Sequence, residues 1–127
     1  NHSRNNFHVT YETLKAGKEV RMFYDQFRTP LSIRLAADMI SRLCRMSVRN
    51  EIINFGGWDR VSRLQIGEMI CEAGGFDKNL LIPISCRTVK GLVQVPDVSM
   101  NTDKLNGYGL AQESVFDEVV AILKNGI

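Results

Sequence analysis

The feature that most constrains the fold is a strand-like run followed at once by a helix-like run, within residues 19–43. Apolar side chains alternate in residues 19–24, and this period of two predicts a strand with Val20, Met22 and Tyr24 on one face. After a polar break, the apolar residues recur at the spacing of a helix, which predicts one buried helix face; they are Leu35, Ala36, Met39, Ile40 and Leu43.

The break itself, residues 25–30 (DQFRTP), predicts a sharp turn that leads into the helix. Thr29 can accept a backbone N–H as the N-cap, and Pro30 suits the first helical position, where no amide donor is missed. Because α/β proteins often place ligand contacts between a strand end and a helix start, Gln26 and Arg28 are candidate binding residues.

Three further helices follow from their capping signals. Residues 5–16 carry an apolar stripe (Phe7, Tyr11, Leu14) that ends before Gly17. Ser62 and Gln65 have the spacing of a capping box, and the helix that they begin should end at residues 74–75, which are glycines. Ser114 should begin the last helix, whose buried face comprises Val115, Phe116, Val119, Val120 and Leu123.

Shorter elements complete the prediction. Residues 51–55 are expected to form a strand that runs into a Gly56-Gly57 turn, and residues 92–95 another short strand. Residues 80–84 should form an edge strand, because Pro83 cannot donate to a ladder. Asn101 or Thr102 should cap one helical turn through Leu105.

This order of helices and strands is typical of an α/β fold with a partly parallel sheet. Two clear strands are too few to cover the apolar faces of these helices, so we expect the remaining strands in an N-terminal part outside this sequence or in a partner chain. The sequence also begins without Met and enters a helix almost at once. It is therefore expected to be a piece of a longer chain.

Composition is that of an ordinary soluble domain, with 127 residues, 44% hydrophobic and 24% charged. A net charge of +2 does not favour a nucleic-acid partner. The residues that come nearest to forming a basic cluster are interpreted as a solvent-exposed face; they are Arg42, Arg45, Arg49, Arg60 and Arg63. The three cysteines fit neither a disulfide framework nor a metal site, and Cys44 and Cys71 are expected in the core. With no signal peptide and no membrane-spanning run, a cytoplasmic location is expected.

Motifs for chemistry are scarce. The sequence contains no glycine-rich phosphate loop, and both histidines, His2 and His8, lie near its start. Tyr11 and Lys15 have the spacing of a Tyr–Lys catalytic pair on one helix face, where a nearby ammonium would favour the phenolate. The favoured interpretation is packing, in which Tyr11 belongs to the apolar stripe and Lys15 extends beside it.

Four stretches, taken in order, resemble extended short-chain dehydrogenase/reductases that act on nucleotide sugars, most closely the dTDP-4-dehydrorhamnose reductase family. Residues 5–7 resemble an Asn-Phe at the start of a helix, and residues 25–30 resemble an Asp-Gln-x-Gly-x-Pro-Thr turn. Residues 54–65 resemble the family's strand, glycine turn and Ser-led helix. Residues 96–105 resemble its segment between a Pro and a Lys-Leu pair.

The resemblance implies that this chain is the C-terminal, substrate-binding portion of a Rossmann-like protein, with its small substrate-binding subdomain. The N-terminal half would carry the NAD or NADP site and the catalytic Tyr and Lys, so this chain would hold no catalytic residue. The full protein would then reduce a nucleotide-activated 4-keto sugar, as in dTDP-rhamnose biosynthesis. Its partners would be the nucleotide sugar and that N-terminal half, with a homodimer left open and neither nucleic acid nor membrane expected.

Within that resemblance, the predicted substrate-binding residues are Asn6, Gln26, Arg28 and Gln94. Asn6 corresponds to an Asn that hydrogen-bonds the phosphate, and Arg28 to an Arg that can bind a diphosphate through its fork of donors. Asp97 is expected to fix its own loop. Gln94 stands near the place of the family's usual Arg before the Pro-Asp pair: either Arg28 substitutes for that Arg, or the ligand differs, or the protein does not turn over a nucleotide sugar. The alternative functions are a nucleotide-sugar epimerase or dehydratase, and a non-catalytic regulatory subunit of the same fold, which the missing Arg fits.

Overall fold

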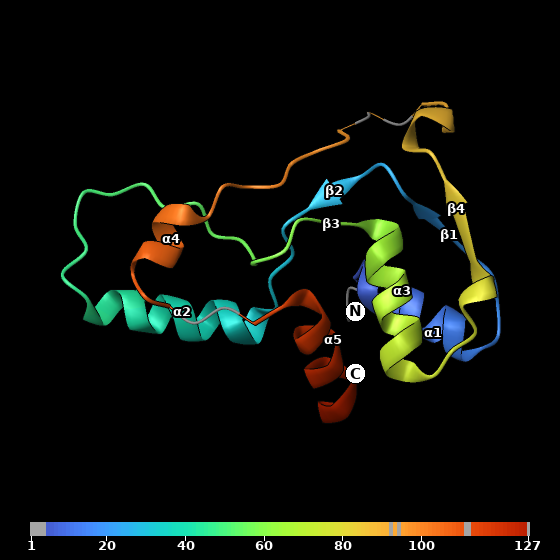
Figure 1. Ribbon diagram of the computed structural model, residues 1–127, viewed down its shortest axis with the longest axis horizontal. Helices are drawn as coiled ribbons and strands as arrows, with labels where there is room; N and C mark the ends of the chain where they lie inside the picture. The colour runs from blue at the N-terminus through green and yellow to red at the C-terminus, as the bar shows by residue number, and fades with distance from the viewer. Residues whose placement is uncertain (1–4, 92, 94, 111–112, 127) are drawn as a thin grey trace.

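The computed structural model describes residues 5–91, 93, 95–110 and 113–126 (Figure 1). Five helices and four short strands are present over these residues, together with two 3-10 turns. In chain order they are α1 (Asn6–Lys15), β1 (Val20–Phe23), β2 (Phe27–Arg28), α2 (Ile33–Arg45), β3 (Val61–Ser62), α3 (Arg63–Gly74), η1 (Lys78–Leu80), β4 (Leu81–Ile84), η2 (Cys86–Thr88), α4 (Asp103–Gly107) and α5 (Val115–Asn125).

The strands form two separate ladders. β1 and β4 pair in parallel, with Met22 opposite Pro83, so the predicted strands at residues 19–24 and 80–84 are confirmed. Each of these strands has one partner, which is why Pro83 is tolerated. β2 and β3 pair antiparallel over two residues, a ladder too short to leave a periodic signal in the sequence.

The larger hydrophobic core lies around α3, which packs against α5 and against the β1–β4 ladder (Figure 1). Its buried residues come from these elements, from α1 and from β3: Leu14, Met22, Val61, Ile70, Cys71, Leu81, Val115 and Val119. Tyr11 packs edge-on against Phe76, with ring centroids 5.5 Å apart, and Lys15 Nζ lies 5.6 Å from the centre of the Tyr11 ring. The packing interpretation of this pair is confirmed.

A smaller core joins α2 to α4 and contains Leu35, Met39, Leu105 and Leu110. Ile53 and Phe55 pack against it, whereas Ile52 between α2 and Phe55 is 88% exposed. The strand predicted at residues 51–55 is therefore wrong as an assignment, although its alternation of inward and outward side chains is present. Among the described residues this segment belongs to neither ladder, and its contact with the segment around residue 101 uses a side chain, Asn54 Nδ2 donating to Asn101 O at 3.0 Å.

The start of α2 is the second correction. The helix begins at Ile33, and Ser32 rather than Thr29 is its N-cap, accepting from Leu35 N at 3.1 Å. Thr29 Oγ1 instead accepts from Met100 N at 3.3 Å. Two residues in this stretch could cap a helix, and the contact between Thr29 and a distant segment decides between them.

The other capping predictions are confirmed. Ser62 and Gln65 form a complete capping box, Gly75 ends α3 in the left-handed conformation, and Ser114 caps α5. At α4, by contrast, the N-cap is Thr102, whose side chain makes no capping hydrogen bond, and Asn101 Oδ1 accepts from Asp103 N. The strand predicted at residues 92–95 falls partly outside the described residues. Cys71 is buried as expected, but Cys44 is exposed, because its position is one residue past the buried stripe of α2.

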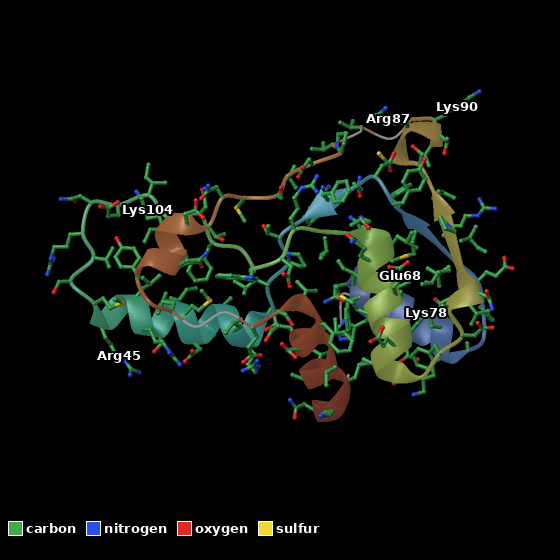
Figure 2. All side chains as sticks on the ribbon, in the orientation of Figure 1. Arg45, Glu68, Lys78, Arg87, Lys90 and Lys104 are labelled. Atoms are coloured by element: carbon green, nitrogen blue, oxygen red, sulfur yellow. The ribbon has the colours of Figure 1, made fainter. Side chains whose placement is uncertain are left out.

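Charged side chains are spread over the ends of separate elements (Figure 2). Of the labelled cations, Arg45, Lys78, Arg87 and Lys104 come from α2, η1, η2 and α4, and Lys90 follows η2. Within the described residues, no helix has both the length and the apolar character needed to cross a bilayer.

Candidate functional site

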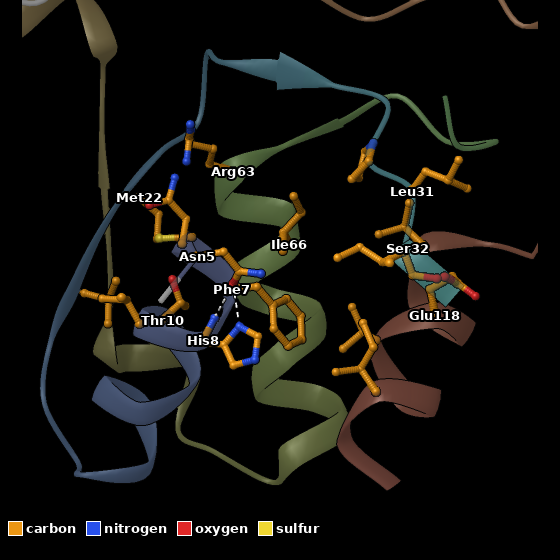
Figure 3. A pocket seen from close by; sticks show the side chains of 18 of the residues that line it. Asn5, Phe7, His8, Thr10, Met22, Leu31, Ser32, Arg63, Ile66 and Glu118 are labelled. Atoms are coloured by element: carbon orange, nitrogen blue, oxygen red, sulfur yellow. Dashed lines mark hydrogen bonds between the residues drawn. The ribbon is translucent and has the colours of Figure 1, made fainter. Parts of the chain in front are cut away.

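A cavity of about 610 Å³, here called the apolar cavity, lies between α1, β1, α3, α5 and residues 30–34 (Figure 3). Its volume is within the range of roughly 300–1,000 Å³ common for small-molecule sites. The apolar part of its lining includes Phe7, Met22, Leu31, Ile66, Val115 and Val119. An aromatic or aliphatic portion of a ligand would therefore find an apolar surface here.

Polar groups gather at one side of the cavity, where α1 and α3 begin. Asn5 caps α1 by accepting from His8 N at 3.0 Å, and its Oδ1 lies 2.6 Å from His8 Nδ1 (Figure 3). Asn6, Arg21 and Arg63 line the same cavity. Amide and guanidinium donors, next to a helix N-terminus with its positive partial charge, are the groups that hold phosphate oxygens.

Arg63 is held in place by Gln26. The Gln26 side chain is buried, and its Oε1 accepts from Arg63 Nε at 2.6 Å. The backbone supports the same contact, since Arg63 N donates to Gln26 O at 3.2 Å. Within the described residues only Nε of this guanidinium group donates to a side chain, so its two terminal nitrogens have donors available for a ligand.

The electrostatics of Arg63 favour an anion. Burial lowers the pKa of its guanidinium, and the positive charge of Arg28 lowers it further. The side chain stays protonated, as arginine does in proteins. No carboxylate in the described part of the chain forms an ion pair with either arginine. A bound anion would relieve the repulsion between the two charges.

The opposite side of the cavity carries an ion-paired carboxylate. Arg34 Nη2 lies 2.7 Å from Glu118 Oε1 and 2.7 Å from Glu113 Oε2, which joins α2 to α5. Burial would raise the pKa of Glu118, but hydrogen bonds and the Arg34 charge outweigh it and lower that pKa. This side of the cavity therefore carries negative charge, and its Arg34 is already ion-paired. An anionic group of a ligand would be more stable at the Arg63 side.

The predicted site residues lie in three different settings. Asn6 is at the cavity, as the first residue of α1, and Gln26 acts on it through Arg63. Arg28 does not line the cavity, because its Nη1 donates to Phe27 O at 2.6 Å and to Val95 O at 3.3 Å. Gln94 lies outside the described residues. The functional roles of all four stay predictions.

Sequence reasoning missed Arg63 as a site residue and assigned it to a solvated face. Its only signal was its position directly after Ser62, which marks a helix start. Asp97, in contrast, fixes its loop as predicted: it accepts from Ser99 N at 2.8 Å and from Arg60 Nη2 at 2.7 Å. Hydrogen bonds from Ser99, with those from Arg60, lower the Asp97 pKa to about 2.

The predicted Gly56-Gly57 turn is a site of close backbone packing. Gly57 N donates to Thr29 O at 3.1 Å, and a Cβ on Gly57 would lie 1.9 Å from Pro30 O. The glycine is thus required by a neighbouring backbone segment. Because Gly57 is packed against Pro30, the turn does not present a set of free backbone N–H groups that could bind a phosphate.

The fold over the described residues is similar to that of solved enzymes that act on nucleotide sugars. The chain matches dTDP-4-dehydrorhamnose reductase of Bacillus anthracis, solved in complex with NADP, with a TM-score of 0.78 and 16% identity over 95% of this chain and 43% of that one. It matches dTDP-glucose 4,6-dehydratase of the same organism, in complex with NAD, with a TM-score of 0.71 and 14% identity, over 96% of this chain and 40% of that one.

A third match is UDP-glucuronic acid 4-epimerase of Bacillus cereus, in complex with NAD, with a TM-score of 0.67 and 17% identity, over 92% of this chain and 36% of that one. Neither a protein-family model nor a curated protein matches the sequence. The α/β fold class and the resemblance to this class of structures are thereby confirmed at the level of the fold. The chain spans about two fifths of the length of the structures it matches.

Proposed function

We propose that this chain is the substrate-recognition part of an NAD(P)-dependent reductase that acts on a nucleotide-activated 4-keto sugar. The observation that carries the proposal is the structural match to dTDP-4-dehydrorhamnose reductase over 95% of the chain. The apolar cavity supports it, because one cavity offers both an apolar wall and a cationic side.

A nucleoside diphosphate fits these two surfaces. The base would lie against Phe7 and Ile66, and the diphosphate would lie at the side formed by Asn6 and Arg63. A guanidinium–phosphate hydrogen bond is charge-assisted and contributes about 1.5–3 kcal/mol. Gln26 is a positioning residue in this arrangement, because it fixes Arg63 without contacting the ligand.

The dinucleotide cofactor is assigned to a separate, N-terminal half of the protein. The matched structures carry NADP or NAD. The residues described here do not fit such a group: a dinucleotide needs an open glycine-rich turn between a strand and a helix, and Gly57 is closed against Pro30.

Exposed apolar side chains support the presence of that N-terminal half. Ile33 is 86% exposed, Ile52 is 88% exposed, and Ile40 is half exposed, all on α2 or on the extended segment beside it. Such residues usually mark a surface that another element covers. A strand of the N-terminal half would pair with residues 51–55 and cover them; a homodimer is the alternative partner.

Epimerase or dehydratase activity is the second candidate function, because the dehydratase and the epimerase also match with TM-scores of 0.71 and 0.67. These activities differ from reduction in their net redox change. A reductase consumes one NAD(P)H for each sugar reduced, whereas an epimerase or dehydratase consumes none. A regulatory subunit of the same fold would turn over no sugar at all.

The test uses the full-length protein with NADH or NADPH and a nucleotide-activated 4-keto sugar, and follows the absorbance of the reduced cofactor. The proposal expects stoichiometric oxidation of the cofactor. Conversion of a nucleotide sugar that bears a 4-hydroxyl group, with NAD present and no net change in its redox state, would establish the second candidate, because a dehydratase forms a 4-keto sugar and a 4-epimerase inverts a 4-hydroxyl. Binding of a nucleoside diphosphate without any turnover would establish the regulatory alternative, and absence of both would reject the assignment.

A further inference from the structure

The sequence contains two Asn-Gly pairs, Asn106-Gly107 and Asn125-Gly126. An Asn-Gly pair is open to an intramolecular reaction, because glycine has no Cβ to keep its backbone nitrogen away from the preceding side chain. That nitrogen can attack Cγ, the carbonyl carbon of the asparagine side chain, and close a five-membered ring. The two pairs are chemically identical, so any difference in their reactivity comes from the fold.

Asn106 is held through both its backbone and its side chain. It lies inside α4, where its N–H donates to Thr102 O at 2.9 Å and its carbonyl oxygen accepts from Gly109 N at 2.9 Å. The side-chain Oδ1 is buried, and Nδ2 lies 3.5 Å from Thr102 Oγ1. The side chain therefore cannot turn towards Gly107 N unless α4 opens.

Asn125 lies in a different setting, as the exposed last residue of α5. Gly126, which carries the attacking nitrogen, has a φ of +85°, so the chain leaves the helical conformation there. Helix ends open at a small free-energy cost. A rotation of the Asn125 backbone that brings its side chain to Gly126 N moves no later residue of the helix.

The two sites differ in how they are anchored, and not in the space around them. An added Cβ on either glycine would meet no atom within 4 Å. Asn106 stands between Leu105 and Leu110, which are both buried in the α2–α4 core, so a rotation at Asn106 would pull one of them out. Gly126 after Asn125 is exposed, and its displacement uncovers no core residue.

We propose that Asn125 is a site of spontaneous deamidation in the folded protein, and that α4 protects Asn106 from the same reaction. Gly126 N bonds to Asn125 Cγ, the Cγ–Nδ2 bond breaks, and ammonia leaves with the proton that Gly126 N has lost. Water then adds to either carbonyl of the succinimide ring and opens it to aspartate or isoaspartate. The reaction is redox-neutral and needs only water, and the inference is independent of the proposed function.

The product changes the end of α5. A carboxylate replaces a neutral amide in the last turn, where the helix carbonyl groups already carry negative partial charge, and this arrangement is unfavourable. The same turn contains Ile122, which lines the apolar cavity, and Leu123, which packs against the larger core. Deamidation is therefore expected to weaken the last turn of α5 beside that cavity.

The experiment incubates the full-length protein at mildly alkaline pH and physiological temperature, and follows the change from amide to acid at each asparagine by peptide mass spectrometry. The proposal expects conversion at Asn125 to be at least about tenfold faster than at Asn106, because Asn106 reacts only when α4 opens. In guanidinium chloride the fold is lost, and the two sites should convert at similar rates. Equal rates in the folded protein, or no conversion at Asn125, would overturn the proposal.

Two variants complete the test. Asn125→Gln keeps the amide but would have to close a six-membered ring, so the acid product at this position should disappear while Asn106 behaves as in wild type. Asn125→Asp carries the charge of the product and is expected to melt at a lower temperature than wild type. Conversion of Asn125→Gln as fast as wild type would contradict the ring-closing route, and an Asn125→Asp melting temperature equal to that of wild type would contradict the effect on α5.

Discussion

Gln26 Oε1 and Arg63 Nε form a 2.6 Å hydrogen bond between residues that are 37 positions apart in the sequence. The contact connects the turn after β1 to the first residue of α3. It is reinforced by the backbone bond from Arg63 N to Gln26 O, so the side chains meet with little freedom. The position of the guanidinium at the apolar cavity is consequently set by a buried amide.

Two substitutions of Gln26 distinguish the effect of orienting Arg63 from the effect of the charge beside it. Gln26→Leu removes the acceptor of Arg63 Nε, and we expect the free energy of unfolding to fall by about 1–3 kcal/mol. We expect the affinity of the full-length protein for a nucleoside diphosphate to fall as well, because Arg63 is no longer held at the cavity. Chemical denaturation and titration calorimetry measure the two effects.

Gln26→Glu is the matched variant. It keeps an acceptor for Arg63 but adds a negative charge beside it, so stability should be retained while diphosphate affinity falls. If both variants bound the diphosphate as tightly as wild type, Arg63 would have no part in binding.

Gly57 is expected to tolerate no side chain. In Gly57→Ala the added Cβ would lie 1.9 Å from Pro30 O, so the loop before α2 must move, and we expect a loss of more than about 3 kcal/mol or failure to fold. Gly107→Ala is the control, because no atom lies within 4 Å of its added Cβ and the residue is in α4. There we expect stability unchanged or raised by about 0.5–1 kcal/mol. Equal melting temperatures for the two variants would contradict the packing described here.

Local chemistry made much of the fold predictable. The starts of α3 and α5 follow from side chains that accept hydrogen bonds from backbone N–H groups three residues later, such as Ser62 from Gln65 N. These predictions are confirmed. The start of α2 was not predictable by the same rule, since Thr29 is committed to Met100, 71 positions away. The candidate site shows the same division: the turn indicated Gln26, whereas the only local signal for Arg63 was its position after the helix cap Ser62.

Substitutions in residues 51–55 test whether another part of the full-length protein covers this segment. Ile53→Lys should lower the free energy of unfolding by about 2–4 kcal/mol, because Ile53 packs against the α2–α4 core. Ile52→Lys should change it by less than about 0.5 kcal/mol if the side chain stays as exposed as it is here. In the full-length protein, a large loss for Ile52→Lys is the result expected from a covering N-terminal half. A small loss there would contradict that assignment.

The Asp97 carboxylate should make stability depend on pH in acid. Hydrogen bonds from Ser99, together with Arg60, lower its folded pKa to about 2, below the ordinary value of 3.8. A lowered folded pKa means that the carboxylate stabilises the fold above the unfolded pKa, and that this contribution is lost as pH falls from about 4 towards 2. Asp97→Asn cannot titrate, so the difference in melting temperature between wild type and this variant should be constant near neutral pH and should shrink across that acid window. Melting curves that stay equally far apart down to pH 2 would show that Asp97 is not held by Ser99 and Arg60 in the folded protein.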